Sequence, residues 1–505
     1  MNNYLTQLLL ITIIITAGGP AALPPPPTAT VTQTVTPSEA PSPTQTAIPT
    51  ATPYPPLQTE GPYLLFQRDE QTLVMMDADG MGRKYIEIPQ NAYISRFENA
   101  FSPNGEWLIY FTGSTEEPYD LALNLFNLKN KSSIRIANLI ASGYPENLEP
   151  LTELISFSEY DTDCANSLEC KLRVIESGFR TGIYQFDWSP GSQEIAFAAQ
   201  IDGPSSDLYI YNNVEENSIR RLTNEPENIG LMIDWAPNGE KILYSSTESN
   251  MNYSFYPLHI ADTNLKSPQN PKIIDRGGLF WFGEGWIDEN SYLLWDGGEG
   301  APPHNFRYID TDSQQINQVW RFVADHYVIN FKQDEFFLLT YPQGFIDPQS
   351  EPEEGIYLVR FDGSYTKITD ENYSPLAEGP GNTYFVLQIE NDTDDTFFLL
   401  SIGTDGKIRG LGEKINFSYP PSTSQDDNWA VITDENETHL YSAQLEPIKS
   451  WDIPYSKIIW RPDSVGFFLN SYPNLYYVSI NNQEFELINV CPSKDCSIGY
   501  YVWLP

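Results

Sequence analysis

The stretch "FDWSPGSQEIAF" at residues 186–197 contains the pattern that decides the fold of this chain. An aromatic residue precedes a proline, a short turn follows the proline, and an apolar run follows the turn. Nearly the same stretch recurs as "NAFSPNGEWLIY" at 99–110, "IDWAPNGEKILY" at 233–244 and "IIWRPDSVGFFL" at 458–469. Because the chain repeats one pattern of strand, turn and strand, a repeat structure is expected.

Each position of this pattern has a structural role. The aromatic residue ends an inner strand and packs between neighbouring units, and the proline stops that strand because it lacks the N–H that a ladder needs. An Asn-Gly pair, as at 104–105 and 238–239, tolerates the positive φ of a tight hairpin. The residues expected to fill these structural roles are Phe101, Pro103, Trp188, Pro190, Trp235, Pro237, Trp460, Pro462, Trp503 and Pro505.

Weaker copies lie between the strong ones, near Trp286, Phe331 and residues 380 and 425. A period of roughly 40 to 50 residues with several short strands per unit is typical of β-propeller blades. The units predict an all-β protein, a single closed propeller of about eight or nine four-stranded blades. The wide interval between Phe101 and Trp188 holds either a further blade or an insertion.

The two ends of the repeat region are incomplete in complementary ways. The last residues, "YYVWLP" at 500–505, match the end of an inner strand and stop there. Residues 63–88 supply three strands with no inner strand before them. We therefore expect the C-terminal strand to join the N-terminal strands and close the ring, which removes exposed sheet edges.

The combination of "DWSPGSQEIAF", "DLYIY" at 207–211 and "RRLT" at 220–223 resembles the WD40-like repeat of TolB-like β-propellers. The resemblance covers about residues 61–505 and is best at 186–223. It implies a ring of four-stranded blades that binds other macromolecules, and it implies no active site.

The N-terminal region differs in character from the repeats. Residues 8–19, "LLLITIIITAGG", are apolar and are followed by Ala21 and Ala22, so residues 1–22 are expected to be a signal peptide, with an N-terminal membrane anchor as the alternative. Residues 23–60 are rich in Pro, Thr and Ser and are expected to form a disordered stalk. The propeller then occupies residues 61–505, and the protein is expected to be extracytoplasmic, either secreted or attached to the cell surface.

The four cysteines form two close pairs, Cys164 with Cys170 and Cys491 with Cys496. In an exported chain such pairs indicate local structural disulfides. A single zinc site made from both pairs is the alternative, but the spacing within each pair fits structural zinc poorly.

The composition is strongly acidic, with 68 acidic residues against 28 basic ones and a net charge of -40. Such a surface repels phosphate backbones and anionic lipids. We therefore expect no nucleic-acid partner, and membrane contact only through the N-terminal segment. Neutral ligands, basic protein surfaces and cations remain as possible binding partners of this acidic surface. The protein is expected to be a monomer.

Sequence motifs of catalysis are missing: there is no G-x-S-x-G, H-E-x-x-H, P-loop or G-x-G-x-x-G. The four histidines, His259, His304, His326 and His439, are scattered. We expect no catalytic, cofactor-binding or metal-ligating residue, no cofactor, and no enzymatic activity. Two stretches have a functional alternative: "FWFGEGW" at 280–286 as a sugar-stacking platform instead of packing between blades, and "ENDTDDT" at 390–396 as a Ca²⁺ loop instead of a solvated hairpin tip.

These observations favour a non-catalytic extracytoplasmic binding scaffold whose propeller loops contact a protein or a glycan at the cell envelope. The alternative is a propeller-type enzyme, a glycoside hydrolase or lyase, with carboxylates at the central mouth. A structural envelope component is the third hypothesis. A pair of carboxylates at the mouth would favour the enzyme, and an apolar or aromatic patch on one rim would favour the binding scaffold.

Overall fold

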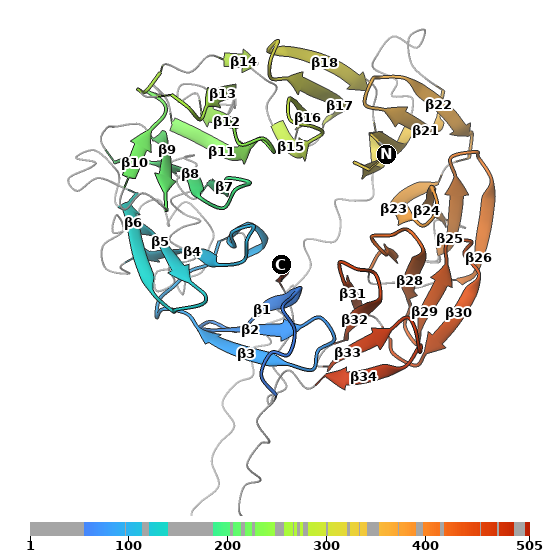
Figure 1. Cartoon of the computed structure of the whole chain (residues 1–505). Coiled ribbons are helices and arrows are strands. Elements are labelled where there is room, and N and C mark those ends of the chain that lie inside the picture. Colours follow the sequence, from blue (N-terminus) through green and yellow to red (C-terminus); the bar gives the residue numbers. More distant parts are fainter. Residues whose placement is uncertain are drawn as a thin grey trace, which may run out of the picture. The chain divides into compact units, whose positions relative to one another are not determined.

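Nine antiparallel sheets follow one another around a ring in the part of the chain that the structure describes (Figure 1). The structure is a computed structural model, and it describes residues 55–95, 97–113, 121–139, 185–201, 206–213, 218–224, 228–247, 257–265, 267–269, 273–275, 281–298, 301–320, 324–332, 334–340, 353–371, 373–389, 397–414, 419–454, 456–471, 474–488 and 500–505. These residues all belong to one compact unit, Tyr54–Pro505. The closed β-propeller is confirmed, and the number of blades is nine.

The blades are numbered here in chain order, and in blades 3 to 9 the first strand along the chain lies at the inner edge (Figure 1). Blade 1 contains β1 (Tyr63–Asp69), β2 (Thr72–Asp77), β3 (Arg83–Glu87) and β35 (Tyr501–Leu504). Blade 2 contains β4 (Trp107–Gly113), β5 (Leu121–Asn127) and β6 (Ser133–Asn138), preceded by the 3-10 turn η1 (Phe97–Asn99). Blade 3 contains β7 (Phe186–Trp188), β8 (Glu194–Ala199), β9 (Asp207–Asn212) and β10 (Ser218–Arg221).

Blade 4 contains β11 (Asn228–Trp235), β12 (Lys241–Thr247), β13 (Leu258–Asp262) and β14 (Ile273–Asp275). Blade 5 contains β15 (Trp281–Trp286), β16 (Ser291–Gly298), β17 (Ala301–Asp310) and β18 (Gln315–Trp320). Blade 6 contains β19 (Ala324–Asn330), β20 (Glu335–Thr340), β21 (Gly355–Arg360) and β22 (Tyr365–Thr369).

Blade 7 contains β23 (Ser374–Gly379), β24 (Thr383–Ile389), β25 (Phe397–Gly403) and β26 (Ile408–Lys414). Blade 8 contains β27 (Ser422–Thr423), β28 (Trp429–Thr433), β29 (Thr438–Ser442) and β30 (Pro447–Trp451). Blade 9 contains β31 (Lys457–Trp460), β32 (Gly466–Ser471), β33 (Asn474–Ser479) and β34 (Phe485–Ile488).

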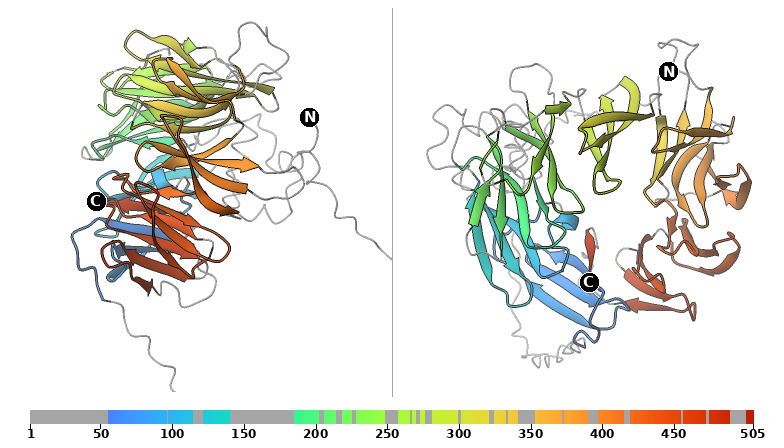
Figure 2. Two further views of the ribbon diagram at one scale, coloured as in Figure 1. Left: turned by 90° about the vertical axis from the view of Figure 1, so that its right-hand side faces the viewer. Right: turned by 45° about the horizontal axis from the view of Figure 1, so that its top comes forward.

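The ring closes in blade 1, as expected from the two incomplete ends of the repeat region. β35 pairs antiparallel with β1, with Tyr63 opposite Leu504 and Phe66 opposite Tyr501. The C-terminal strand thus becomes the inner strand of the first blade, beside the N-terminal strands (Figure 1). Two other views show the same blades around the ring (Figure 2).

Blade 2 departs from the four-stranded pattern at its inner edge. The inner strand is reduced there to two isolated bridges to β4, Tyr93 with Phe111 and Phe101 with Leu108, because the residues just before Phe101 form η1 instead of an extended strand. Blades 2 and 3 are direct neighbours in the ring. The rings of Phe111 and Phe186 are 5.9 Å apart, and the backbone N–H of Asn104 donates to Ser192 Oγ at 2.9 Å.

The core consists of apolar layers between neighbouring blades. Side chains alternate along a strand, so Phe336 packs with blade 5 while its neighbour Phe337 packs with blade 7. The Phe337 ring stacks on Tyr384 with 4.3 Å between centroids and 2° between planes. Apolar burial of this kind is the main stabilising contribution in each layer, and it holds the inner strands where their polar side chains can meet.

Residues 55–60, which were expected to belong to the stalk, contact blade 1. The fully buried Asp77 accepts hydrogen bonds from Gln58 N at 2.8 Å and from Thr59 Oγ1 at 2.7 Å. Arg83 N donates to Pro55 O at 3.0 Å. This segment therefore lies on the hairpin of β2 and β3 before the first strand begins. Within the described residues, no helix has the length and apolarity to span a membrane.

Candidate functional site

Most of the repeat residues lie at the ends of the inner strands and in the turns that follow them. Phe101, Trp188, Trp235 and Trp460 are all buried, Trp503 is partly buried, and the prolines lie at the more exposed turn tips. Trp188 Nε1 donates to Ala100 O of the preceding blade at 3.5 Å. These aromatic side chains are enclosed by the blades, so they are not available to a ligand.

Several inner carboxylates join one blade to the next. The Oδ2 atom of Asp187 in β7 accepts a hydrogen bond from Trp235 N at 2.6 Å. Asp234 in β11 accepts one from the Tyr292 hydroxyl of blade 5. These acids therefore contribute to the cohesion of the ring.

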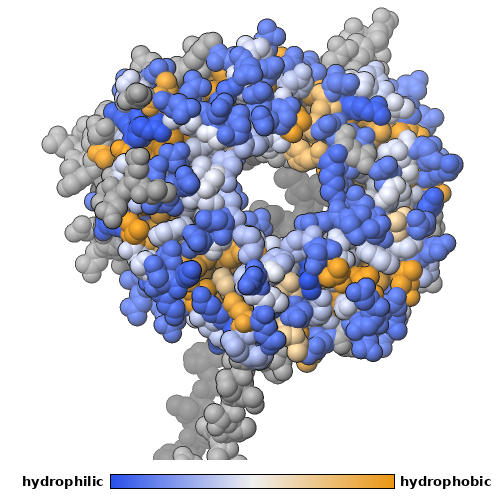
Figure 3. All heavy atoms as spheres, in the orientation of Figure 1, coloured by the Kyte–Doolittle hydropathy of each residue, from blue (hydrophilic) through white to orange (hydrophobic). Residues whose placement is uncertain are grey.

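A group of polar residues at the junction of blades 6, 7 and 8 has a different character, and we call it the mouth cluster. It lies on three inner strands, β19, β23 and β27, that are neighbours in space (Figure 1), on the turns that follow β19 and β27, and at the start of β20. Its members are Asn330, Lys332, Glu335, Glu378 and Asp427. The ring surrounds a central opening in the space-filling view, and hydrophilic side chains cover most of the face shown there (Figure 3).

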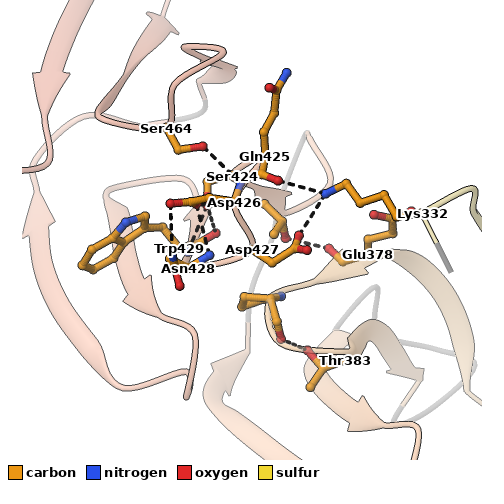
Figure 4. A network of polar contacts seen from close by, with 12 residues as sticks. Lys332, Glu378, Thr383, Ser424, Gln425, Asp426, Asp427, Asn428, Trp429 and Ser464 are labelled. Carbon is orange, nitrogen blue, oxygen red and sulfur yellow. Dashed lines mark hydrogen bonds and ion pairs between the residues drawn. The ribbon is translucent and has the colours of Figure 1, made fainter.

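Lys332 spans the cluster from the turn after β19 to the turn after β27. Its ammonium donates to Asp427 Oδ1 at 3.1 Å and to Gln425 O at 3.2 Å, so blade 6 reaches blade 8 past blade 7 (Figure 4). The two charged side chains are 52% and 42% exposed. A pair this exposed contributes little to stability, so both charges remain open to an approaching group.

Glu378 lies on β23, the strand between the other two, and its backbone carbonyl accepts a hydrogen bond from Thr423 Oγ1 at 2.8 Å. Among the described residues, none donates a hydrogen bond to its carboxylate. Burial raises the pKa of Glu378 above its ordinary value, the nearby carboxylates of Asp427 and Glu335 raise it further, and the Lys332 ammonium opposes them.

Behind Glu378, the cluster continues into the layer between blades 6 and 7. Glu335 is 4% exposed and accepts a hydrogen bond from the Tyr384 hydroxyl at 2.7 Å. Burial raises the pKa of this tyrosine, and so do its hydrogen bond to Glu335 and the charge of that carboxylate. Asn330 is 8% exposed, and its Oδ1 has no hydrogen-bond donor among the described residues. The cluster thus holds acceptors that the described part of the chain does not satisfy.

Of the other candidate residues from the sequence, some are packed or hydrogen-bonded within the blades and the rest lie outside the described residues. Trp286 of the aromatic stretch packs edge-on against Tyr292 with 5.2 Å between ring centroids, a packing contact. His259 is buried and its Nε2 is 2.8 Å from Ser246 Oγ, and His439 is 3.4 Å from Asp434. Cys164, Cys170, Cys491, Cys496, the loop at 390–396 and the side chains of His304 and His326 lie outside the described residues. In the described part, no group of three or more His, Cys, Asp and Glu side chains could hold a metal ion.

The mouth cluster could not be identified from the sequence. Its residues come from the degenerate repeats between 280 and 450, where the aromatic residue, the proline and the turn do not recur regularly enough to indicate which positions lie on inner strands. The chain also has 68 acidic residues, so a single Glu or Asp carries no signal by itself.

No family model matches the chain, and no curated protein matches it. Solved structures are similar to it at low identity. A eukaryotic initiation factor is 10% identical, with a TM-score of 0.46 over 88% of this chain and 98% of that one. Dipeptidyl peptidase 4 from Porphyromonas gingivalis is 10% identical, with a TM-score of 0.43 over 82% of this chain and 65% of that one. TolB from Acinetobacter baumannii is 11% identical, with a TM-score of 0.28 over 69% and 79% of the two chains. At such identities the likeness concerns the propeller fold alone, and no activity follows from it.

Proposed function

We propose that this propeller is a non-catalytic binding scaffold that works outside the cytoplasm, as a monomer, and presents its turns and central mouth to a protein or glycan of the cell envelope. The observation that carries the proposal is that the polar and aromatic residues around the ring fall into two groups with different contacts. The repeated aromatic residues and inner aspartates are engaged between blades, whereas the mouth cluster keeps acceptors that the described chain does not satisfy. Rigid blades that carry variable turns suit recognition.

The proposed location rests on the N-terminal region of the sequence. An apolar segment at 8–19 followed by a Pro- and Thr-rich stretch is typical of a chain that is exported and held away from an envelope. The paired cysteines, as local disulfides, suit the same compartment. Asp77 would then be the point at which the stalk joins the propeller, because it binds residues 58 and 59.

A propeller-type enzyme is the second candidate, and one observation favours it. Glu378 and Asp427 are two carboxylates at the mouth, and the pKa of Glu378 is raised, as a general acid requires. The Lys332 ammonium is hydrogen-bonded to Asp427 Oδ1, however, so this carboxylate oxygen is already engaged.

The test is binding by the immobilised full chain, assayed with envelope extract and with a glycan array. We expect a specific partner whose capture is lost in a variant altered at the mouth or rim turns and retained in Asp405→Asn. Asp405 is a suitable control because it lies on the turn between β25 and β26 and pairs with Lys407. Cleavage of a polysaccharide that Glu378→Gln abolishes would replace the proposal by the enzyme, and the lack of any partner would contradict the proposal directly.

A further inference from the structure

We propose that the mouth cluster is a receptor for a cationic side chain, the guanidinium or ammonium group of an arginine or lysine presented by a partner protein. This inference rests on the proposed binding function and names the chemistry of the partner. It is argued from three features of the cluster: its charge, its unsatisfied acceptors and its width.

The charge of the cluster favours a cation. Glu335, Glu378 and Asp427 bring three carboxylates to one junction, and within the cluster the ammonium of Lys332 faces them alone. The field of the whole chain has the same sign, with a net charge of -40. A basic partner is therefore attracted at long range by the chain and at short range by the cluster.

The unsatisfied acceptors define what the incoming group must supply. The carboxylate of Glu378 receives no hydrogen bond from the described residues. Oδ1 of the nine-tenths buried Asn330 receives none either, but that atom is closed to solvent, so the incoming group binds at Glu378. Buried acceptors are normally paired. An ammonium brings three N–H donors and a guanidinium brings five, and neither brings an acceptor. Either group complements a site made of acceptors.

Lys332 shows that this rim already holds an ammonium. Its Nζ binds one carboxylate oxygen and one backbone carbonyl of the turn at 425–427 (Figure 4). The pair is largely exposed, so a second cation can approach the Glu378 side without first breaking a buried bond. A guanidinium is favoured over an ammonium because its planar fork binds a carboxylate through two parallel hydrogen bonds.

The width of the cluster argues against a bare metal ion. Its acceptors come from three blades, and no set of three or more His, Cys, Asp or Glu side chains within the described residues is gathered closely enough to ligate a metal. A metal requires short contacts from all its ligands at once. A forked organic cation on a flexible side chain can contact separated acceptors.

Binding should also be coupled to protons. The groups that face Glu378 are the carboxylates of Glu335 and Asp427 and the ammonium of Lys332, while the Tyr384 hydroxyl lies behind them. A bound cation favours the ionised form of Glu378 and lowers its pKa again. Affinity should therefore fall as the pH drops through the raised pKa of this carboxyl, with protons released on binding near that pH.

The experiment is a titration of the full chain with three blocked tripeptides, acetyl-Gly-Arg-Gly-amide, its lysine counterpart and its citrulline counterpart, which has nearly the same shape as arginine without the charge. We expect the arginine peptide to bind best and the citrulline peptide to bind at least about tenfold more weakly. Glu378→Gln should weaken binding of the arginine peptide by about tenfold or more and remove its pH dependence, whereas Asp405→Asn should leave both unchanged.

Equal binding of the arginine and citrulline peptides, an equal loss in Asp405→Asn, or no binding of the arginine peptide would overturn the inference. Thermal unfolding of each variant separates a folding defect from a lost contact, and Asp427→Asn provides a second variant if Glu378→Gln does not fold. If the partner captured by the full chain still binds the Glu378→Gln and Asp427→Asn variants, the proposal of a cation receptor is wrong, whereas the proposal of a binding scaffold is retained. If there is no partner at all, both proposals fail.

Discussion

The backbone N–H of Trp235 donates a 2.6 Å hydrogen bond to Oδ2 of Asp187, so the acid of one repeat holds the tryptophan of the next. The other oxygen, Oδ1, accepts from Trp188 N at 2.9 Å within its own repeat. In the following copy, Asp234 accepts a hydrogen bond from the hydroxyl of Tyr292 in blade 5. The acid that precedes the tryptophan in both copies therefore links a blade to its successor.

Replacing Asp187 by alanine should lower the free energy of unfolding by about 1–3 kcal/mol, because the partly buried N–H of Trp235 would lose its acceptor. Urea unfolding measures this change. Asp262→Ala is the matched control, since Asp262 is exposed at the end of β13, and it should change stability by less than about 0.5 kcal/mol. Equal effects of the two variants would show that the bond between blades contributes nothing measurable.

Replacing Trp235 by alanine should lower the free energy of unfolding by about 3–5 kcal/mol, the usual result of removing a large buried aromatic side chain. Trp235 is 5% exposed and packs with Ile233, Ile242 and Tyr244. The same folded variant should keep its affinity for a captured partner. A loss of binding without a change in melting temperature would mean that the repeat tryptophans face the ligand, contrary to their structural assignment.

Removing residues 500–505 should open the ring in blade 1. β1 pairs with β35 over four residues on each strand. Loss of β35 leaves the backbone N–H and C=O groups along this edge of β1 unpaired, and such an edge promotes association between chains. We expect a lower melting temperature together with oligomers in size-exclusion chromatography. A truncated chain that stays monomeric with an unchanged melting temperature would show that closure by β35 is unimportant for stability.

Glu378→Gln should stabilise the fold at neutral pH and have little effect in acid. Because the folded chain holds this proton more tightly than the unfolded chain, its contribution to stability is present below the ordinary carboxyl pKa and is lost as the pH rises through the raised pKa. The difference in melting temperature between variant and parent should therefore be larger at pH 7 than below about pH 4. The opposite trend would indicate that Glu378 is stabilised as a charged partner of Lys332.

Asp77→Ala should release the segment that precedes β1. The buried carboxylate receives hydrogen bonds from residues 58 and 59, and these donors would lose their acceptor. Limited proteolysis should then cleave the chain near residues 55–60 faster than in the parent, while the propeller itself stays intact. An unchanged cleavage rate would show that other contacts, such as the one between Arg83 N and Pro55 O, hold the segment.

The sequence was sufficient for the architecture because each blade is a local unit that repeats. An aromatic residue, a proline and a turn recur at a fixed spacing, so Trp188, Trp235 and Trp460 each mark the end of an inner strand without knowledge of any distant contact. The incomplete ends of the repeat region also predicted the pairing of β35 with β1, since each end lacks what the other supplies. The degenerate copies between 280 and 450 left the number of blades at eight or nine, and the structure shows nine. The inner positions of these copies carried no signal.

The positions of the acids relative to one another depend on how the blades pack around the ring. Lys332 and Asp427 are 95 residues apart, and they meet because three blades converge at the centre of the ring. The sequence contains the same residue type at Asp187, which accepts a hydrogen bond from the next blade, and at Asp427, which accepts one from Lys332 in the mouth cluster. Local patterns determine strands and turns because those depend on neighbours in the chain. The role of a carboxylate depends on burial, on nearby charges and on available donors, and closure of the ring determines all three.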